Sequence, residues 1–551
     1  MADVTQHKLA VIYHDKLAEV CQSTVAMNTE SPSQRHLAAA LKSRRNLQDR
    51  GLNVVHTDEL SRLERESLIA NGFLRPIIKG WYMPTRPDET DTETTAWHSS
   101  GNEFIARYSE ERFGSAWCVS ADHSIRLHAG NTSLPSQIVL NTPDGKNNVL
   151  QLPANNSLLD YRAKDFPEPS NRTIAGGLRA MTLEHALTRV SDAFFRTYAE
   201  DAQIALLSLR DSSELARHLL TGGQSVVAGR LAGALHACGQ SAFADDIVAT
   251  MRSAGYSIVE TNPFMAPPAT LQIVRGESPY VTRIRLLWES MRSDVLKSFP
   301  PAPGMPSDVD GYMAAVKDSY VKDAYNSLSI EGYRVTNELI EQVATGNWNP
   351  EQSQDDFKSR DAMAARGYHQ ARKEVEKSIL RILSGENSGL VASRDHRTWF
   401  RELFGPSVDA KLLAPQDLAG YRGHQVFIRN VAHVPPPVEA VRDMMPALFD
   451  LMESEPEASV RAVLGHFIFV FTHPYMDGNG RMGRFLMNAM LASGGYPWTV
   501  IEVTRRAEYM SALNEASSKG NIAPFSQFIA SSTGYLQPDS LSDVSRERPT
   551  A

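Results

Sequence analysis

Residues 473–484 concentrate the side chains of this chain that could do chemistry. They read His-Pro-Tyr-Met-Asp-Gly-Asn-Gly-Arg-Met-Gly-Arg. An imidazole such as His473, with an unperturbed pKa near roughly 6.5, suits a general base at neutral pH. Asp477 supplies a carboxylate, which a hard cation such as Mg²⁺ prefers. Arg481 and Arg484 are three residues apart, so a helix would place both guanidinium groups on neighbouring parts of one face.

The segments around this stretch predict two buried helices joined by a loop. An apolar run from Val460 to Phe471 precedes it, and a second apolar run from Phe485 to Leu491 follows. Runs of this length fit buried helices better than strands. Gly478 and Gly480 allow the loop backbone to turn and to point N–H groups inward. With Arg481 opening the second helix, those N–H groups form an anion site at a helix N-terminus.

Each of these features alone is more often structural than catalytic. Together, however, they resemble the signature His-Pro-Phe-x-(Asp/Glu)-Gly-Asn-Gly-Arg-x-x-Arg of Fic-domain proteins. The single departure is Tyr475 in place of Phe, which keeps an aromatic anchor. The resemblance extends over about residues 308–530 and implies an all-α Fic domain with a β-hairpin flap.

The resemblance also implies an activity and its residues. Fic proteins of this type transfer AMP from ATP to a Ser, Thr or Tyr hydroxyl of a target protein. By that resemblance His473 is the base and Asp477 holds Mg²⁺. The implied nucleotide-binding residues are Gly478, Asn479, Gly480, Arg481, Arg484 and Tyr509. Relatives that transfer the γ-phosphate have Lys at the position of Gly480, so Gly favours nucleotidyl transfer. Many relatives have Asn where this chain has Ser517, which leaves the base preference open. UMP transfer and removal of AMP on the same loop are alternatives.

A possible brake lies upstream of the Fic signature. Val316, Tyr320, Ala324 and Leu328 are spaced by four residues, which predicts one helix that Gly332 ends. The segment Ser327-Leu-Ser-Ile-Glu331-Gly332 could be an ordinary polar helix end. It resembles the inhibitory helix of many Fic proteins, (Ser/Thr)-x-x-x-Glu-(Gly/Asn). By that resemblance Glu331 pairs with Arg484 and occupies the space of the γ-phosphate. Bidentate carboxylate–guanidinium pairing is well suited to such competition.

Residues 421–428 and the Pro435-Pro436-Pro437 run match the Fic flap. A short strand pair there would present an edge to which a target peptide could add by backbone hydrogen bonds. An ordinary surface hairpin is the alternative. The implied docking residues are Val426, Phe427, Ile428, Arg429 and Asn430.

The N-terminal region, 1–95, has the pattern of a winged helix. Helical segments at Ser33–Gly51 and near Arg65–Asn71 precede a predicted β-hairpin at 73–82. A winged helix commonly reads DNA, and basic residues between Lys42 and Arg50 favour duplex DNA as a partner. The acidic segment 88–93 does not favour DNA. A small domain whose role is only to pack against the rest of the protein is an equal alternative.

Residues 96–270 predict a mixed α/β domain. Strands are expected at 138–140 and 149–152, flanking a turn at 143–145, with helices from 182 to 252. The stretches "GWYMP" and "SVVAGRLAGAL" make residues 34–264 resemble AbiEi-like bacterial antitoxins and transcriptional regulators. That resemblance implies DNA binding or partner sensing. It gives an alternative of a different class, a DNA-binding regulator whose Fic part is a sensor.

Length and composition set the remaining expectations. A chain of 551 residues is too long for one core, so we expect a mainly α protein in several domains. Besides the two N-terminal regions, these are a helix and Pro-rich linker at 271–307, the Fic domain at 308–536 and a disordered tail at 537–551. The net charge of -8 gives no global attraction to nucleic acid. Three cysteines without metal spacing and no long apolar run predict a cytoplasmic protein with no membrane partner. The sequence leaves the formation of oligomers open.

Overall fold

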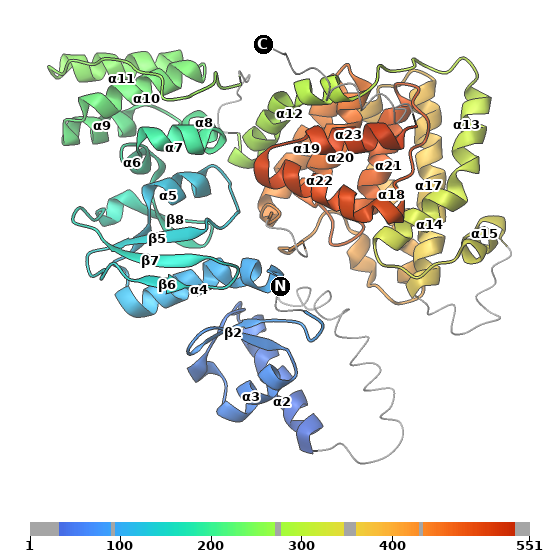
Figure 1. Ribbon diagram of the computed structural model, residues 1–551, viewed down its shortest axis with the longest axis horizontal. Helices are drawn as coiled ribbons and strands as arrows, with labels where there is room; N and C mark the ends of the chain where they lie inside the picture. The colour runs from blue at the N-terminus through green and yellow to red at the C-terminus, as the bar shows by residue number, and fades with distance from the viewer. Residues whose placement is uncertain (1–31, 90–93, 270–276, 347–359, 429–432, 535–551) are drawn as a thin grey trace, which may run out of the picture. The chain divides into compact units, whose positions relative to one another are not determined.

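The computed structural model describes residues 32–89, 94–269, 277–346, 360–428 and 433–534 (Figure 1). Helices dominate them, which confirms the prediction of a mainly α protein. The chain divides into two compact units. The first comprises residues 1–283 and 426–435, and the second comprises 284–425 and 436–551. Within the described ranges, no helix is long and apolar enough to cross a membrane.

The first part of unit 1 is the predicted arrangement of two helices and a hairpin. Its sheet has the order β1-β3-β2, with both pairs antiparallel. Gly80 turns the hairpin with a φ of 87°, which a residue without Cβ adopts at little cost. Leu47, Leu68 and Leu74 are buried in the core between helices and sheet. The elements are α2 (Pro32–Asp49), β1 (Val55–His56), η2 (Thr57–Glu59), α3 (Arg62–Ala70), β2 (Leu74–Ile78) and β3 (Trp81–Pro84).

A four-stranded sheet follows, in the order β4-β5-β7-β6. Strands were expected at 138–140 and 149–152, and both exist, but they are not partners across the intervening turn. The unpredicted strand β7 lies between them, parallel to β5 and antiparallel to β6. The elements are α4 (Thr95–Phe113), β4 (Cys118–Val119), α5 (Ala121–His128), β5 (Gln137–Thr142), β6 (Val149–Gln151), β7 (Ser157–Arg162), η3 (Pro169–Asn171), β8 (Arg172–Ala175) and β9 (Leu178–Met181).

The rest of unit 1 is a helical bundle in which two glycines have a packing role. A Cβ atom on Gly229 or Gly233 would collide with the backbone carbonyl of Val259 or Thr261, respectively. The small residues of "SVVAGRLAGAL" therefore allow the chain to pass directly over α10. The helices are α6 (Leu183–Leu187), α7 (Asp192–Thr197), α8 (Ala199–Leu207), α9 (Ser213–Gly222), α10 (Ser225–Ala237) and α11 (Ser241–Ser253).

The described residues of unit 2 form helices joined by loops, without a strand. Helix α20 has nearly all of its residues buried, which fits its apolar sequence. The helix expected to run through residues 316–328 is in fact two helices, because α13 ends at Asp318 and α14 begins at Tyr320. The elements are α12 (Pro279–Ser298, within which the two units divide), α13 (Val309–Asp318), α14 (Tyr320–Ile330), α15 (Asn337–Thr345), α17 (Arg360–Leu383), α18 (Ser388–Asp409), η4 (Pro415–Leu418), α19 (Val438–Ser454), α20 (Ala458–Thr472), α21 (Asn479–Ala492), η5 (Val503–Arg505), α22 (Arg506–Lys519) and α23 (Ala523–Ser532).

The strand pair predicted for the flap does not form in the described residues 421–428 and 433–437. The buried guanidinium of Arg422 offers a physical reason, because it donates to backbone carbonyls that a strand partner would otherwise engage. The flap carbonyl oxygens are those of His424 (3.1 Å) and Pro436, and the same guanidinium also donates to the carbonyl of His473 (2.9 Å). The consecutive prolines also lack the N–H groups that a β-ladder needs.

Candidate active site

The loop between α20 and α21 is shaped by its two end residues. His473 caps α20 in a left-handed conformation, with a φ of 50°. Such a conformation is uncommon for a residue with a side chain and often marks a functional position. Gly478 precedes α21 with a φ of 79°. The imidazole Nδ1 of His473 lies 3.4 Å from the carbonyl oxygen of Val470. A proton on Nδ1 would therefore leave the lone pair on Nε2, as a general base requires.

Two side chains of the signature hold the loop itself. The ring of Tyr475 is buried and stacks on Phe400, with ring centroids 3.9 Å apart. Through this contact the aromatic ring anchors the loop against α18. The Asn479 side chain accepts a hydrogen bond from the Tyr475 N–H (2.9 Å) and donates one to its carbonyl (2.8 Å). These two hydrogen bonds fix the Asn479 side chain against the loop backbone.

The two arginines of the signature are almost fully buried, with 1% of Arg481 and 3% of Arg484 exposed. Nη2 of Arg481 lies 3.2 Å from the Tyr333 hydroxyl, and its guanidinium stacks over the rings of Tyr333 and Phe404. Within the described part of the chain, Nε of Arg481 and Nη1 of Arg484 have no hydrogen-bond partner. Buried donors are normally satisfied. The arrangement is therefore prepared for an anionic ligand beside the N-terminus of α21.

Ser327, Glu331 and Arg484 come together as the resemblance implied. Nη2 of Arg484 lies 2.8 Å from Oε1 of Glu331, and Nε donates to the Ser327 hydroxyl at 2.7 Å. Burial alone would lower the pKa of Arg484, but Glu331 together with Tyr509 and Tyr368 outweighs burial and raises that pKa. Gly332, with a φ of 83°, turns the chain after α14. A Cβ atom on Gly480 would come closer than 3.0 Å to Oε1 of Glu331, a separation that real Cβ atoms essentially never show.

Asp477 lies at the open side of the loop, with 49% of its side chain exposed. Its Oδ1 accepts from the N–H of Gly478 at 2.7 Å, and its Oδ2 is 3.8 Å from Nη2 of Arg481. An accessible carboxylate next to an anion site fits a hard cation shared with phosphate oxygens. The described residues contain no group of three or more His, Cys, Asp and Glu that could hold a metal.

Tyr509 lies behind the arginines, and its side chain is buried. Its ring packs on Phe525 and Phe528, and burial raises its pKa to about 12. Its hydroxyl lies 2.8 Å from Nε2 of His466, which the sequence analysis did not identify as a site residue. Burial, together with the charge of Arg484, lowers the pKa of His466 to about 3. The sequence signal that could have found His466 is a titratable residue inside the otherwise apolar run of α20.

The predicted docking residues are less completely described. Val426, Phe427 and Ile428 group with unit 1 by their contacts and are not in a strand. Arg429 and Asn430 lie outside the described residues. The docking role therefore stays a prediction.

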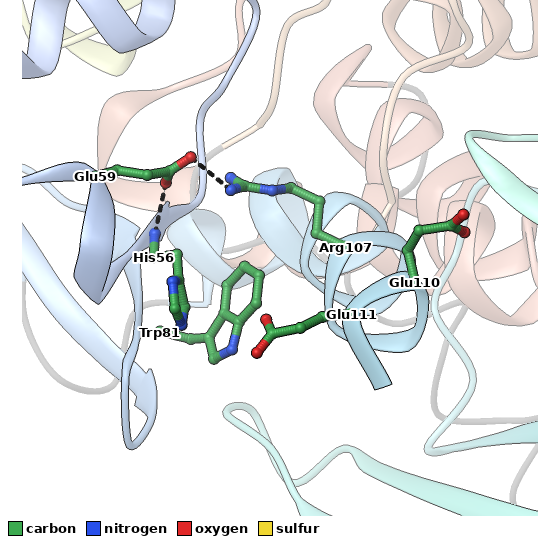
Figure 2. Close-up of a pocket in the computed structure, with 6 residues that line it drawn as sticks. All are labelled: His56, Glu59, Trp81, Arg107, Glu110 and Glu111. Atoms are coloured by element: carbon green, nitrogen blue, oxygen red, sulfur yellow. Dashed lines mark hydrogen bonds and ion pairs between the residues drawn. The ribbon is translucent and has the colours of Figure 1, made fainter. Parts of the chain in front are cut away.

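Unit 1 has a hollow of about 370 Å³ whose lining includes Trp81 and charged residues of α4 (Figure 2). Oε1 of Glu59 pairs with Nη2 of Arg107 at 2.7 Å, and Oε2 accepts from the N–H of His56 at 2.7 Å. Another lining residue, Glu110, pairs with Arg179 at 3.0 Å. These charges are satisfied within the protein, so the hollow does not display the unpartnered buried donors found at the signature loop.

Comparison with known proteins identifies the domain that carries this loop. Residues 396–491 match the family model described as Fic/DOC family. A protein adenylyltransferase Fic from Nematostella vectensis is 30% identical over 244 residues, which are 42% of this chain and 53% of that protein. One from Drosophila willistoni is 30% identical over 224 residues, 40% of this chain and 41% of that protein. The solved structure of residues 134–508 of Fic-1 from C. elegans is 18% identical, with a TM-score of 0.34, and the match covers 63% of this chain and 93% of that one.

The chain therefore contains a Fic domain in its C-terminal half, as the signature predicted. It spans about half or less of the length of these two curated relatives.

Proposed function

We propose that the chain is a protein adenylyltransferase that transfers AMP from ATP to a hydroxyl side chain of a target protein. The observation that carries this proposal is the buried guanidinium of Arg484, with an unpartnered Nη1 among the described residues, beside the N-terminus of α21. Such a site binds phosphate through both charge and backbone N–H groups. The similar proteins from Nematostella and Drosophila, named protein adenylyltransferase Fic, support the same reaction.

The residues of the loop suit the steps of this transfer. Nε2 of His473 takes the proton of the target's Ser, Thr or Tyr hydroxyl. The hydroxyl oxygen bonds to the α-phosphorus, the bond from that phosphorus to the bridging oxygen breaks, and pyrophosphate leaves. Arg484 and the N–H groups at the start of α21 hold the phosphates in line and stabilise their charge. Asp477 would hold Mg²⁺, which when bound neutralises part of the charge on the phosphates.

We propose further that Glu331 inhibits the transfer. Its carboxylate accepts a hydrogen bond from Nη2 of Arg484 and lies against Gly480 at the N-terminus of α21. A γ-phosphate held by Arg484 at this helix N-terminus needs the space that the carboxylate fills, so Glu331 and a productively bound ATP exclude one another. ATP bound without this anchor has its α-phosphorus misaligned, and misplacement by about 1 Å can slow a reaction on the order of a hundredfold.

Labelled ATP tests the reaction and its base. The Glu331→Gly chain should become labelled, or label a target in lysate, from [α-³²P]ATP and not from [γ-³²P]ATP. His473→Ala in the same background should lose the labelling and keep nucleotide binding. Label from the γ-position would show phosphate transfer and contradict the proposal. Stronger competition by UTP than by unlabelled ATP would instead favour UMP transfer.

A second proposal concerns the N-terminal module, which we infer binds duplex DNA. The supporting observation is that Lys42, Arg45 and Arg50 are exposed on and just after α2. Gel shifts of the full chain should weaken as salt rises, because phosphate contacts release counterions. The Lys42→Ala/Arg45→Ala/Arg50→Ala variant should lose most of the shift, and absence of any shift at low salt would contradict DNA binding.

A further inference from the structure

Helix α14, which carries the proposed brake, is attached to residues 502–506 by three polar contacts. Nζ of Lys322 pairs with Oε1 of Glu502 at 2.7 Å. Oδ1 of Asn326 accepts from the N–H of Val503 at 2.8 Å. The carbonyl oxygen of Ile330 accepts from Nε of Arg506 at 2.9 Å. Residues 322, 326 and 330 are spaced by four, so these contacts follow one face of the helix.

The last contact lies directly beside Glu331. The carbonyl groups of the final turn of a helix have no partner within the helix, and cations are favoured at this end. The Arg506 guanidinium fills this role for Ile330, the residue before Glu331. Its position therefore constrains where the Glu331 carboxylate can reach.

A different face of α14 is attached much more firmly. Oδ2 of Asp323 accepts from the Tyr368 hydroxyl at 2.7 Å and pairs with Nη1 of Arg372 at 2.6 Å. The side chains of Arg372 and Asp323 are only 1% and 4% exposed, whereas those of Lys322 and Glu502 are 62% and 45% exposed. Exposed ion pairs contribute little, while breaking a buried pair is strongly destabilising. The attachment to α17 is therefore the firmer one, and the exposed Lys322–Glu502 pair is the weakest contact of the attachment to 502–506.

We propose that residues 502–506 act as a strap that sets the position of the inhibitory Glu331, with Arg506 and Asn326 as positioning residues. The inference rests on the proposed function in that Glu331 is taken to restrain the transfer. The strap itself is a physical property of α14 and can be measured without any activity. Because the strap leads into α22, a shift of α22 would be transmitted to the brake.

Hydrogen exchange tests the strap directly. In the full chain, Arg506→Ala should speed amide exchange in the last turn of α14 and at Gly332 and Tyr333 by about fivefold to tenfold, the effect of losing one hydrogen bond. Asn326→Ala should do so one turn earlier. The matched control is Arg505→Ala, because Arg505 pairs with Glu508 at 2.8 Å and contacts Ser531 and Ser532 instead. Unchanged exchange in Arg506→Ala, or an equal change in Arg505→Ala, would overturn the strap.

Automodification with labelled ATP then separates the strap from the brake. Arg506→Ala should label about fivefold to tenfold faster than the wild type. In the Glu331→Gly background the same substitution should give no further acceleration, because there is no carboxylate left to position. An equal acceleration in both backgrounds would show that Arg506 acts on the nucleotide and contradict a positioning role. Failure of Glu331→Gly to accelerate labelling would overturn the proposed brake, while the exchange result would still decide the strap.

Discussion

The carboxylate of Glu331 lies in space that is open only because residue 480 is glycine. A Cβ atom at this position would meet Oε1 of Glu331 and come within 3.2 Å of Nη1 of Arg484. The signature glycine therefore has a second consequence besides freeing the loop backbone. It leaves room at the N-terminus of α21 for either a carboxylate or a phosphate.

Gly480→Ala should consequently weaken the brake. The added methyl group displaces the Glu331 carboxylate. Gly480→Ala should therefore accelerate automodification more in the chain that has Glu331 than in the Glu331→Gly chain. The measurement is the ratio of labelling rates with and without Gly480→Ala in each background. We expect that ratio to be about tenfold larger when Glu331 is present, given how steeply rate depends on alignment. Equal ratios would mean that the methyl group affects only the nucleotide.

Asp477→Asn should reduce the Mg²⁺-dependent transfer by at least about tenfold. Substitution of a residue that only hydrogen-bonds to a metal ligand already costs about this much. The amide keeps the shape of the carboxylate and removes its charge. A Mg²⁺ titration in the Glu331→Gly background measures the change, and the midpoint should move to higher Mg²⁺. An unchanged midpoint would exclude Asp477 as the ligand.

Tyr475→Phe should stabilise the protein by about 1 kcal/mol. The Tyr475 hydroxyl is buried and has no hydrogen-bond partner among the described residues, and burial raises its pKa. Removing the hydroxyl removes the free-energy cost of burying it without a hydrogen bond, and the stacking on Phe400 is kept. Urea denaturation provides the measurement. The matched control is Tyr496→Phe, which should destabilise by about 1 kcal/mol because the Tyr496 hydroxyl donates to Pro300 at 2.7 Å. Loss of stability in Tyr475→Phe would be inconsistent with an unpartnered hydroxyl.

His466 should make stability fall in mild acid. Burial lowers its pKa to about 3 in the folded state, whereas an unfolded histidine titrates near roughly 6.5. Below that value the unfolded chain binds a proton that the folded chain does not, so the free energy of unfolding decreases. Between pH 7 and pH 5 the contribution is about 2 kcal/mol. Urea denaturation measures the free energy of unfolding at both pH values. The decrease from pH 7 to pH 5 should be smaller by this amount in His466→Gln than in the wild type, and equal decreases would contradict a buried neutral imidazole.

The sequence could predict the parts of the site that are local. The signature loop and its two flanking helices occupy one continuous stretch, and their apolar runs and glycines are visible in the chain. The pair of Glu331 and Arg484 spans 153 positions, and only resemblance to a known family linked them. His466 and Tyr333 carry no motif, so their contribution appears only when α20, α21 and the end of α14 are packed together.

Errors in the predicted fold have equally specific causes. Strand β7 was not predicted. It lies between β5 and β6 in the sheet and pairs in parallel with β5. Parallel pairing joins segments that are not adjacent in sequence, so no local turn signal indicates it. The flap was expected to form strands, whereas Arg422 engages its backbone carbonyls. The strap could not be foreseen either, because two of its partners are backbone atoms, the Ile330 carbonyl and the Val503 N–H. Backbone groups exist at every residue and leave no mark in a sequence pattern.

The most direct test of the account is the rate of automodification of wild type and Glu331→Gly at saturating [α-³²P]ATP and Mg²⁺. Nη2 of Arg484 lies 2.8 Å from Oε1 of Glu331, and this carboxylate lies against Gly480 in the space that we propose for the γ-phosphate. Removing the carboxylate should raise the rate on the order of a hundredfold, and Arg484→Ala added to Glu331→Gly should abolish that gain. Equal rates for wild type and Glu331→Gly would contradict inhibition by this pair.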